Sequence, residues 1–238
     1  MSHKPRKHSE IKITQSTAKR LVSSWESGRQ SIPARQINPE RHLIVTEGAR
    51  TEPLYFEAIR NRINYQFHGS WISIEILGAG MNTVSLMELA VSATKSSLNA
   101  YSHVWLVYDR DSFPADDFNA VAIFCKNCSD EETKYHAIWS NESYELWYLL
   151  HFQFLQSALH RDMYTEKLTS HLLAQNDGQY TKSRTDMFQI LESRIDMAID
   201  HAKKLEAING GKTPNDSNPG TMMHKLMLHL KPYLNTKI

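Results

Sequence analysis

Strand and helix patterns alternate four times between residues 42 and 154, and this alternation constrains the fold more than any other feature of the chain. The predicted strands are short and apolar, with many β-branched residues, at 42–46, 71–77, 103–108 and 136–139. Apolar residues at helical spacing predict a helix after each strand, at 51–63, 83–97, 116–125 and 142–154. Strands joined through helices by short connections predict an α/β fold with a doubly wound, mostly parallel, four-stranded sheet.

The chain divides into three regions by charge and pattern. Residues 1–40 carry eight lysines and arginines against three glutamates, a net charge of +5, while the rest of the chain carries −4. A basic arm of this kind suits a polyanion such as nucleic acid, with an ordinary solvated tail as the alternative. Residues 41–155 form the predicted α/β domain. Residues 156–238 show only helical patterns, so we expect a helical C-terminal extension packed on that domain.

Composition is that of an ordinary globular protein, with 41% hydrophobic and 22% charged residues. The sequence contains no apolar stretch long enough to span a bilayer, and its polar, basic start lacks the apolar core of a secretory signal. We therefore expect a cytoplasmic protein without a membrane partner. Cys125 and Cys128 lack a histidine pair at zinc-site spacing, so they are interpreted as thiols at a helix end.

Carboxylates follow two of the predicted strands. Glu47 and Gly48 come directly after the first strand, and Asp109 and Asp111 follow the third. Parallel strands of an open α/β sheet carry their ligands at their carboxyl ends, so we expect these acids to converge there. Converging carboxylates repel one another unless a cation joins them, and Mg²⁺ (or Mn²⁺) is the hard divalent ion that oxygen ligands suit. The alternative is that each acid simply forms a turn.

A second group of candidate residues surrounds the start of the fourth predicted helix. Glu145 can add a metal ligand, and Asn141 can orient a phosphate or a water molecule. Plain helix capping by Asn141 and Glu142 is the alternative, because acids and asparagine favour helix N-termini. His151 is a candidate base, with a packed histidine as the alternative.

Cations near these acids are candidate contacts for phosphate groups. Arg50 and Arg110 flank the acidic residues directly in the sequence. The alternative for Arg110 is an ion pair that relieves repulsion between its acidic neighbours. Lys182, Lys212 and Lys225 are further candidates, although the glycines before Lys212 lack the spacing of a phosphate-binding loop.

The pattern of a Glu after one strand and Asp-x-Asp after a later one resembles the TOPRIM domain, which occurs in topoisomerases, primases and nucleases. Longer segments resemble the RloB family: VTEGARTEPLYF (45–56), YDRD (108–111), SNESYELWYLLHF (140–152) and NPGTMMHKL (218–226). Ala49-Arg50 departs from the acidic-then-basic pair that we expect in that family, which leaves this loop more positive. The resemblance covers nearly the whole chain.

The resemblance implies a prokaryotic anti-phage or restriction-linked protein, often encoded beside an ABC-type ATPase partner. We expect a metal-dependent nuclease that cleaves DNA or RNA, including tRNA, with Glu47 as general base or metal ligand and Asp109 and Asp111 holding Mg²⁺. One alternative is a non-catalytic module that binds nucleic acid or docks an ATPase. Another is a nucleotidyl- or phosphotransferase acting on a small nucleotide. The substrate and the oligomeric state stay open at this point.

Overall fold

A computed structural model describes residues 40–67, 72–78, 80, 82–110 and 114–234. The basic arm that the sequence predicts lies outside these residues, except for Glu40, and so does the candidate ligand Asp111. The described residues belong to one compact unit that begins at Pro39. No helix among them is long and apolar enough to cross a bilayer.

Five strands form one mixed, mostly parallel sheet in the order β2-β1-β3-β4-β5. They are β1 (Glu40–Thr46), β2 (Ile72–Gly78), β3 (His103–Asp109), β4 (Lys134–Asn141) and β5 (Gly220–Thr221). The first four strands run parallel to one another, as the strand–helix alternation predicts. The prediction of four strands is corrected by β5, which pairs antiparallel with β4. Two residues are too few to show a strand period, so β5 leaves no pattern in the sequence.

Nine helical segments connect or follow the strands. They are α2 (Thr51–Phe67), α3 (Thr83–Ser96), α4 (Ala115–Cys128), α5 (Glu145–Leu149), α6 (Arg161–Leu173), α7 (Met187–Leu191), the 3₁₀ helix η1 (Glu192–Arg194), α8 (Ile195–Ile208) and α9 (Met223–Leu234) within the described residues. The helix expected at 142–154 is the five-residue α5. It ends because the amides of His151 and Phe152 donate to carbonyls three residues back, which tightens the turn.

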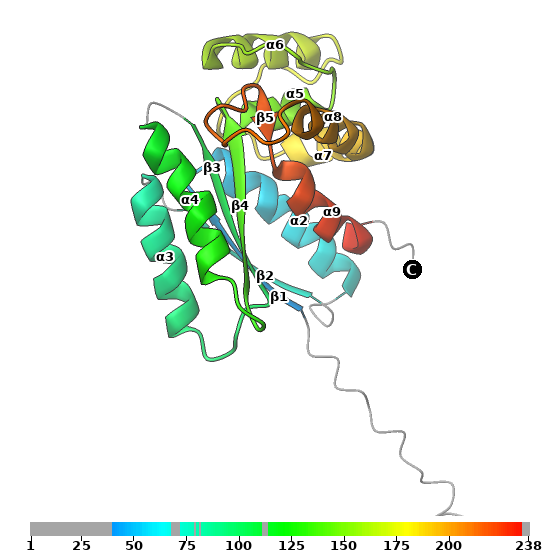
Figure 1. Cartoon of the computed structure of the whole chain (residues 1–238). Helices are drawn as coiled ribbons and strands as arrows, with labels where there is room; N and C mark the ends of the chain where they lie inside the picture. Colours follow the sequence, from blue (N-terminus) through cyan, green and yellow to red (C-terminus); the bar gives the residue numbers. More distant parts are fainter. Residues whose placement is uncertain (1–39, 68–71, 79, 81, 111–113, 235–238) are drawn as a thin grey trace, which may run out of the picture. The chain divides into compact units, whose positions relative to one another are not determined.

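Helices cover both faces of the sheet. Figure 1 shows α3 and α4 against one face and α2 and α9 against the other. The strand side chains alternate accordingly, because successive residues of a strand point to opposite faces. Leu43 and Val45 pack in the core beneath α3 and α4. Ile44 and Trp105 pack in the larger core beneath α2 and α9.

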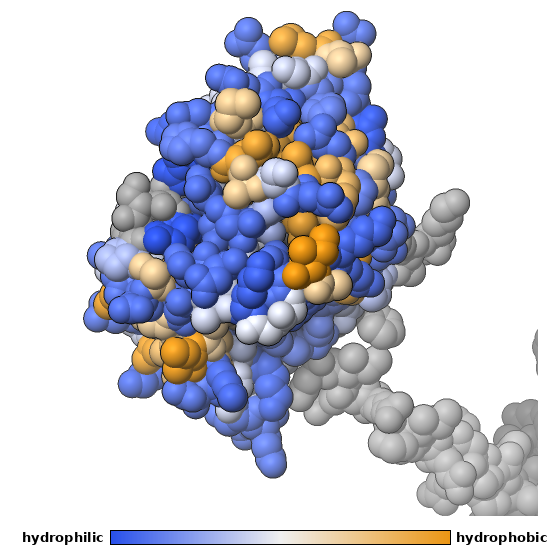
Figure 2. Space-filling model, turned by 45° about the horizontal axis from the view of Figure 1, so that its top comes forward, coloured by the Kyte–Doolittle hydropathy of each residue, from blue (hydrophilic) through white to orange (hydrophobic). Residues whose placement is uncertain are grey.

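The region after residue 156 returns to the sheet through β5 and α9. Met222, between these two elements, donates its amide hydrogen to the carbonyl of Trp139 in β4. α9 then packs against β4, α2 and α8. The view in Figure 2 shows a face that is mostly hydrophilic, with hydrophobic residues gathered toward its upper middle and right and in smaller patches at its top and lower left. α9 contributes its apolar side to the larger core, where Leu226, Met227 and Leu230 are buried.

The strand order fixes where a ligand would bind. β2 lies on one side of β1 and β3 on the other, so the chain reverses its direction of winding between β1 and β3. In open α/β sheets the crevice at the carboxyl ends of two such strands is the usual ligand site. Here that crevice lies between Thr46 and Asp109, the last residues of β1 and β3.

Candidate functional site

Glu47 and Asp109 meet at the switch point. The Glu47 amide donates to the carbonyl of Val107 at 2.9 Å, which extends the β1–β3 ladder by one residue. In return, the Asp109 amide donates to Glu47 Oε2 at 3.2 Å. The parallel pairing of β1 with β3 therefore brings Glu47 and Asp109 together, as the sequence predicts.

Glu52 joins this pair, although sequence reasoning treated it only as part of a helix start. It lies in the first turn of α2 and is 5% exposed. Its carboxylate lies against Gly48, so close that a Cβ added to Gly48 would be 2.1 Å from Glu52 Oε2. Only glycine leaves room for this approach. The sequence did hold a signal for this contact, because Glu52 follows Gly48 by only four residues.

Glu145 supplies a fourth carboxylate from the first residue of α5, where it is buried. Its Oε1 accepts a hydrogen bond from the Tyr180 hydroxyl at 3.0 Å. A pocket of about 310 Å³ lies among these acids. Its lining residues come from the β1–α2 loop, the end of β3, the α5 region and the loop before α7: Gly48, Ala49, Arg50, Thr51, Glu52, Asp109, Tyr144, Glu145 and Lys182. The pocket thus combines carboxylates with two of the predicted phosphate contacts.

Burial and mutual repulsion raise the pKa values of three of these acids. Burial is the largest cause, raising the pKa of Glu47 to about 7 and that of Asp109 to about 8. Repulsion by Glu52 adds to both shifts, while Arg161 opposes both. The pKa of Glu52 also rises to about 7, mainly through burial and then through repulsion by Glu145. Charge on this cluster is therefore costly unless a cation joins it.

Several predicted site residues lie elsewhere in the structure. The Asn141 side-chain amide donates to the carbonyls of Pro214 and Asn215, so Asn141 holds a loop and does not cap α5. Arg110 Nε donates to Asn215 Oδ1 at 2.6 Å. Neither Asn141 nor Arg110 lines the pocket described above.

The remaining candidates are also placed outside the pocket. His151 is fully buried behind α5, where Nδ1 donates to the Trp147 carbonyl and burial lowers the pKa of the imidazole to about 3. Lys225 pairs with Glu206 at 2.8 Å, and Lys212 donates to Asn209. Glu142 is partly buried just before α5. A position close to a motif in the sequence was therefore not enough to bring these side chains to the switch point.

A family model described as "RloB-like protein" matches residues 42–230. No curated protein and no solved structure matches the chain. The matched range holds β1 from its third residue, all of β2 to β5, the three carboxylates that line the pocket, and Glu47, which accepts the amide hydrogen of Asp109. It thus covers most of the described chain, and the chain belongs to the RloB-like family.

Proposed function

We propose that the chain is a TOPRIM-like, Mg²⁺-dependent nuclease that cleaves phosphodiester bonds of DNA or RNA as an effector of prokaryotic defence. The observation that carries the proposal is the convergence of Glu47, Glu52, Asp109 and Glu145 at the switch point of the sheet. Carboxylate oxygens are the donors that Mg²⁺ and Mn²⁺ prefer. The raised pKa values supply the second support, because they identify charges that a cation would relieve.

The residues divide into three roles in this proposal. Asp109 and Glu47 hold the ion, with Glu145 as a further ligand and Asp111 joining them through its place in the Asp-x-Asp motif. A bound Mg²⁺ supplies charge neutralisation and Lewis-acid activation of the phosphate. Glu47 has the alternative role of general base, because without a bound ion its pKa of about 7 lies near the ambient pH, where a base works best.

Arg50 and Lys182 are the proposed phosphate contacts. Both line the pocket, and both come from loops rather than from the sheet. The two loops are joined, since the Thr51 hydroxyl donates to the Lys182 carbonyl at 3.2 Å. One strand of nucleic acid would therefore lie across the β1–α2 loop and the loop before α7.

A nucleotidyl- or phosphotransferase is the second candidate, and the size of the pocket favours it. A volume of about 310 Å³ is at the small end of the range for small-molecule sites. The same carboxylates and cations would serve that reaction. The two candidates differ in the substrate consumed, which a direct assay separates.

The test is a cleavage assay with Mg²⁺, Mn²⁺ or EDTA on plasmid DNA, single-stranded DNA, total RNA and tRNA, with and without the neighbouring ABC-type ATPase. Glu47→Gln and Asp109→Asn should abolish cleavage. Glu57→Gln, in α2 but outside the pocket, is the matched control and should cleave like the unaltered protein. Equal cleavage by Asp109→Asn would refute the proposal. Consumption of an added nucleoside triphosphate in the arm without the ATPase, with no nucleic-acid cleavage, would favour the transferase.

A further inference from the structure

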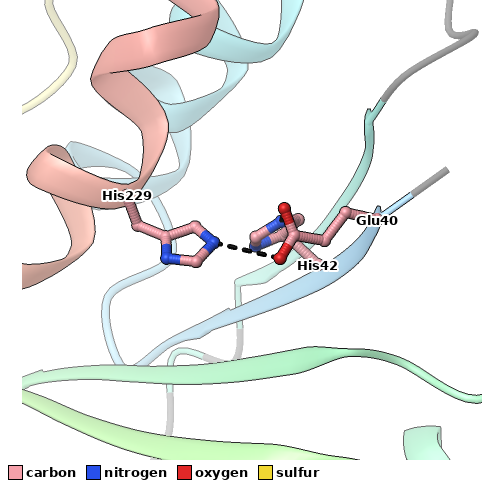
Figure 3. Close-up of side chains that lie close together, drawn as sticks. All are labelled: Glu40, His42 and His229. Atoms are coloured by element: carbon pink, nitrogen blue, oxygen red, sulfur yellow. Dashed lines mark hydrogen bonds and ion pairs between the residues drawn. The ribbon is translucent and has the colours of Figure 1, made fainter.

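A second group of ligand-type side chains lies at the opposite end of the sheet. Glu40 is the first residue of β1, His42 lies two residues later on the same strand, and His229 comes from α9. One ligand atom from each lies within 4.8 Å of the other two. Figure 3 shows the two imidazoles turned toward the Glu40 carboxylate from different elements. The closest approaches are 3.3 Å from His229 Nε2 to Glu40 Oε1 and 3.6 Å from His42 Nε2 to Glu40 Oε2.

His42 is the unusual member of this group. Its side chain is fully buried, yet Nε2 makes no hydrogen bond to any described residue. Buried polar nitrogens nearly always have a partner, so this one calls for an explanation. Nε2 is directed at the Glu40 carboxylate, beyond hydrogen-bond range but close enough to share an ion with it.

We propose that Glu40, His42 and His229 bind one Zn²⁺-class ion that ties α9 to β1. Two imidazole nitrogens and one carboxylate oxygen form a donor set that Zn²⁺ accepts. Bonds of about 2.0–2.1 Å in tetrahedral geometry place neighbouring ligand atoms roughly 3.3 Å apart. His229 Nε2 lies 3.3 Å from Glu40 Oε1 and His42 Nε2 lies 3.6 Å from Glu40 Oε2, so each nitrogen is near that spacing from a different oxygen of the carboxylate. A small rotation of the carboxylate would direct one oxygen at an ion held by both imidazoles. Glu40 and His229 are each 30% exposed, so water can fill the fourth position.

Neighbouring side chains orient these ligands. The Tyr233 hydroxyl donates to Glu40 Oε2 at 2.8 Å, and His103 Nε2 bonds Glu40 Oε1 at 2.9 Å. His103 is itself held by a bond of 2.9 Å between its Nδ1 and His136 Nε2. Hydrogen bonds of this kind fix the orientation of the side chains that bind the ion at metal sites.

The proposal has one cost, at Trp105. The indole N–H can only donate, and it donates to His42 Nδ1 at 3.1 Å, so the metal-free His42 carries its proton on Nε2. When Nε2 binds the ion, that proton leaves to solvent and another occupies Nδ1, so the ring stays neutral. Trp105 must then give up its bond. Ion binding should therefore change the environment of the Trp105 indole.

This site is separate from the proposed nuclease centre. Glu40 is the first residue of β1 and Glu47 follows its last residue, so seven strand steps, roughly 23 Å, separate them. The two donor sets also differ, since imidazole nitrogens suit Zn²⁺ and oxygens alone suit Mg²⁺. The failure of either proposal leaves the other standing.

The experiment measures Zn²⁺ binding to chelator-treated full-length protein by competition with a chromophoric chelator. Each of the single variants His229→Ala and Glu40→Gln removes a ligand and should abolish the binding of one Zn²⁺ equivalent. His160→Ala is the matched control, because His160 also lies 3.2 Å from an acid, Asp162, but at an exposed place on the surface. The double variant Glu47→Gln/Asp109→Asn should keep this equivalent. Circular dichroism of each variant checks the fold.

Trp105 provides a second readout that does not depend on counting ions. Zn²⁺ should change the tryptophan fluorescence of the unaltered protein, and Trp105→Phe should lose that change while binding Zn²⁺ at least as tightly. Unchanged stoichiometry and affinity in folded His229→Ala and Glu40→Gln would overturn the proposal. So would loss of the same equivalent in Glu47→Gln/Asp109→Asn, because the ion would then belong to the carboxylate pocket.

Discussion

Gly48 and Glu52 lie in direct contact at the candidate site, so each restricts the other. A Cβ on Gly48 would overlap the Glu52 carboxylate at 2.1 Å, and Glu52 is too buried to move aside freely. We expect Gly48→Ala to destabilise the protein by about 1–3 kcal/mol and to displace the carboxylate from the pocket. Urea denaturation measures the cost. In a Glu52→Ala background the added cost should disappear, and an equal cost in both backgrounds would contradict the clash.

Asp109 should make the metal-free protein sensitive to pH. Its pKa rises from 3.8 to about 8 on folding, so the folded state holds the proton more tightly than the unfolded state. The resulting stability is fully present below about pH 4 and is lost as the pH rises through about 8, with Glu47 adding a loss near pH 7. We expect the melting temperature in EDTA to fall between pH 5 and 8.

Two comparisons check the source of this pH dependence. Mg²⁺ should restore part of the lost stability at pH 8, because it binds the ionised carboxylates. Asp109→Asn should flatten the curve, because the amide does not titrate. A melting temperature that depends on pH equally in Asp109→Asn and in the unaltered protein would show that other groups cause the effect.

Residue types and their spacing predicted that Glu47, Asp109 and Glu145 converge at the carboxyl ends of the strands, and these three do gather there. Of the five candidate phosphate contacts, two line the pocket (Arg50 and Lys182) and three do not (Arg110, Lys212 and Lys225). Glu52 and the histidine group at the start of β1 were not predicted. Glu52 reaches the site because Gly48 has no side chain, and His229 reaches Glu40 through the packing of α9 on the sheet. Both contacts depend on tertiary packing, which periodicity does not encode.

Helix α3 and strand β5 also differ in whether local or long-range contacts determine them. α3 begins where the sequence predicts, because Asn82 Oδ1 accepts the amide hydrogen of Ser85 at 2.9 Å. Both residues lie close together in the chain. β5 was not predicted, since it exists only through its pairing with β4, about 80 positions earlier in the chain. Elements with local signals were predicted, and the element that depends on a distant partner was not.

The cap of α3 can be tested at the scale of this one helix. Asn82→Ala removes the acceptor for the Ser85 amide and should cost about 1 kcal/mol of unfolding free energy. Asn82→Ser should recover most of the loss, because serine also caps well. Denaturant titration of the three proteins measures both effects. Equal stability of Asn82→Ala and the unaltered protein would show that α3 needs no side-chain cap.

At the scale of the whole molecule, charge is divided between a basic arm and a mildly acidic remainder. Each cation that neutralises a phosphate releases counterions, so nucleic-acid affinity should fall steeply with salt. Lys4, Arg6, Lys7 and Arg20 are four of the eight cations in residues 1–40. Replacing all four by glutamine should weaken binding and flatten the plot of log affinity against log salt by up to about 3–4 units of slope.

A comparison with a variant of the carboxylate pocket separates nucleic-acid binding from the chemical step. Fluorescence anisotropy at several salt concentrations gives the slope, and cleavage at saturating substrate gives the rate of the chemical step. The glutamine variant should lose affinity while its saturated rate stays near that of the unaltered protein, whereas Asp109→Asn should lose rate while keeping the slope. An unchanged slope in the glutamine variant would show that the arm is a solvated tail. The candidate phosphate contacts Arg50 and Lys182 in the pocket would then carry the nucleic-acid binding.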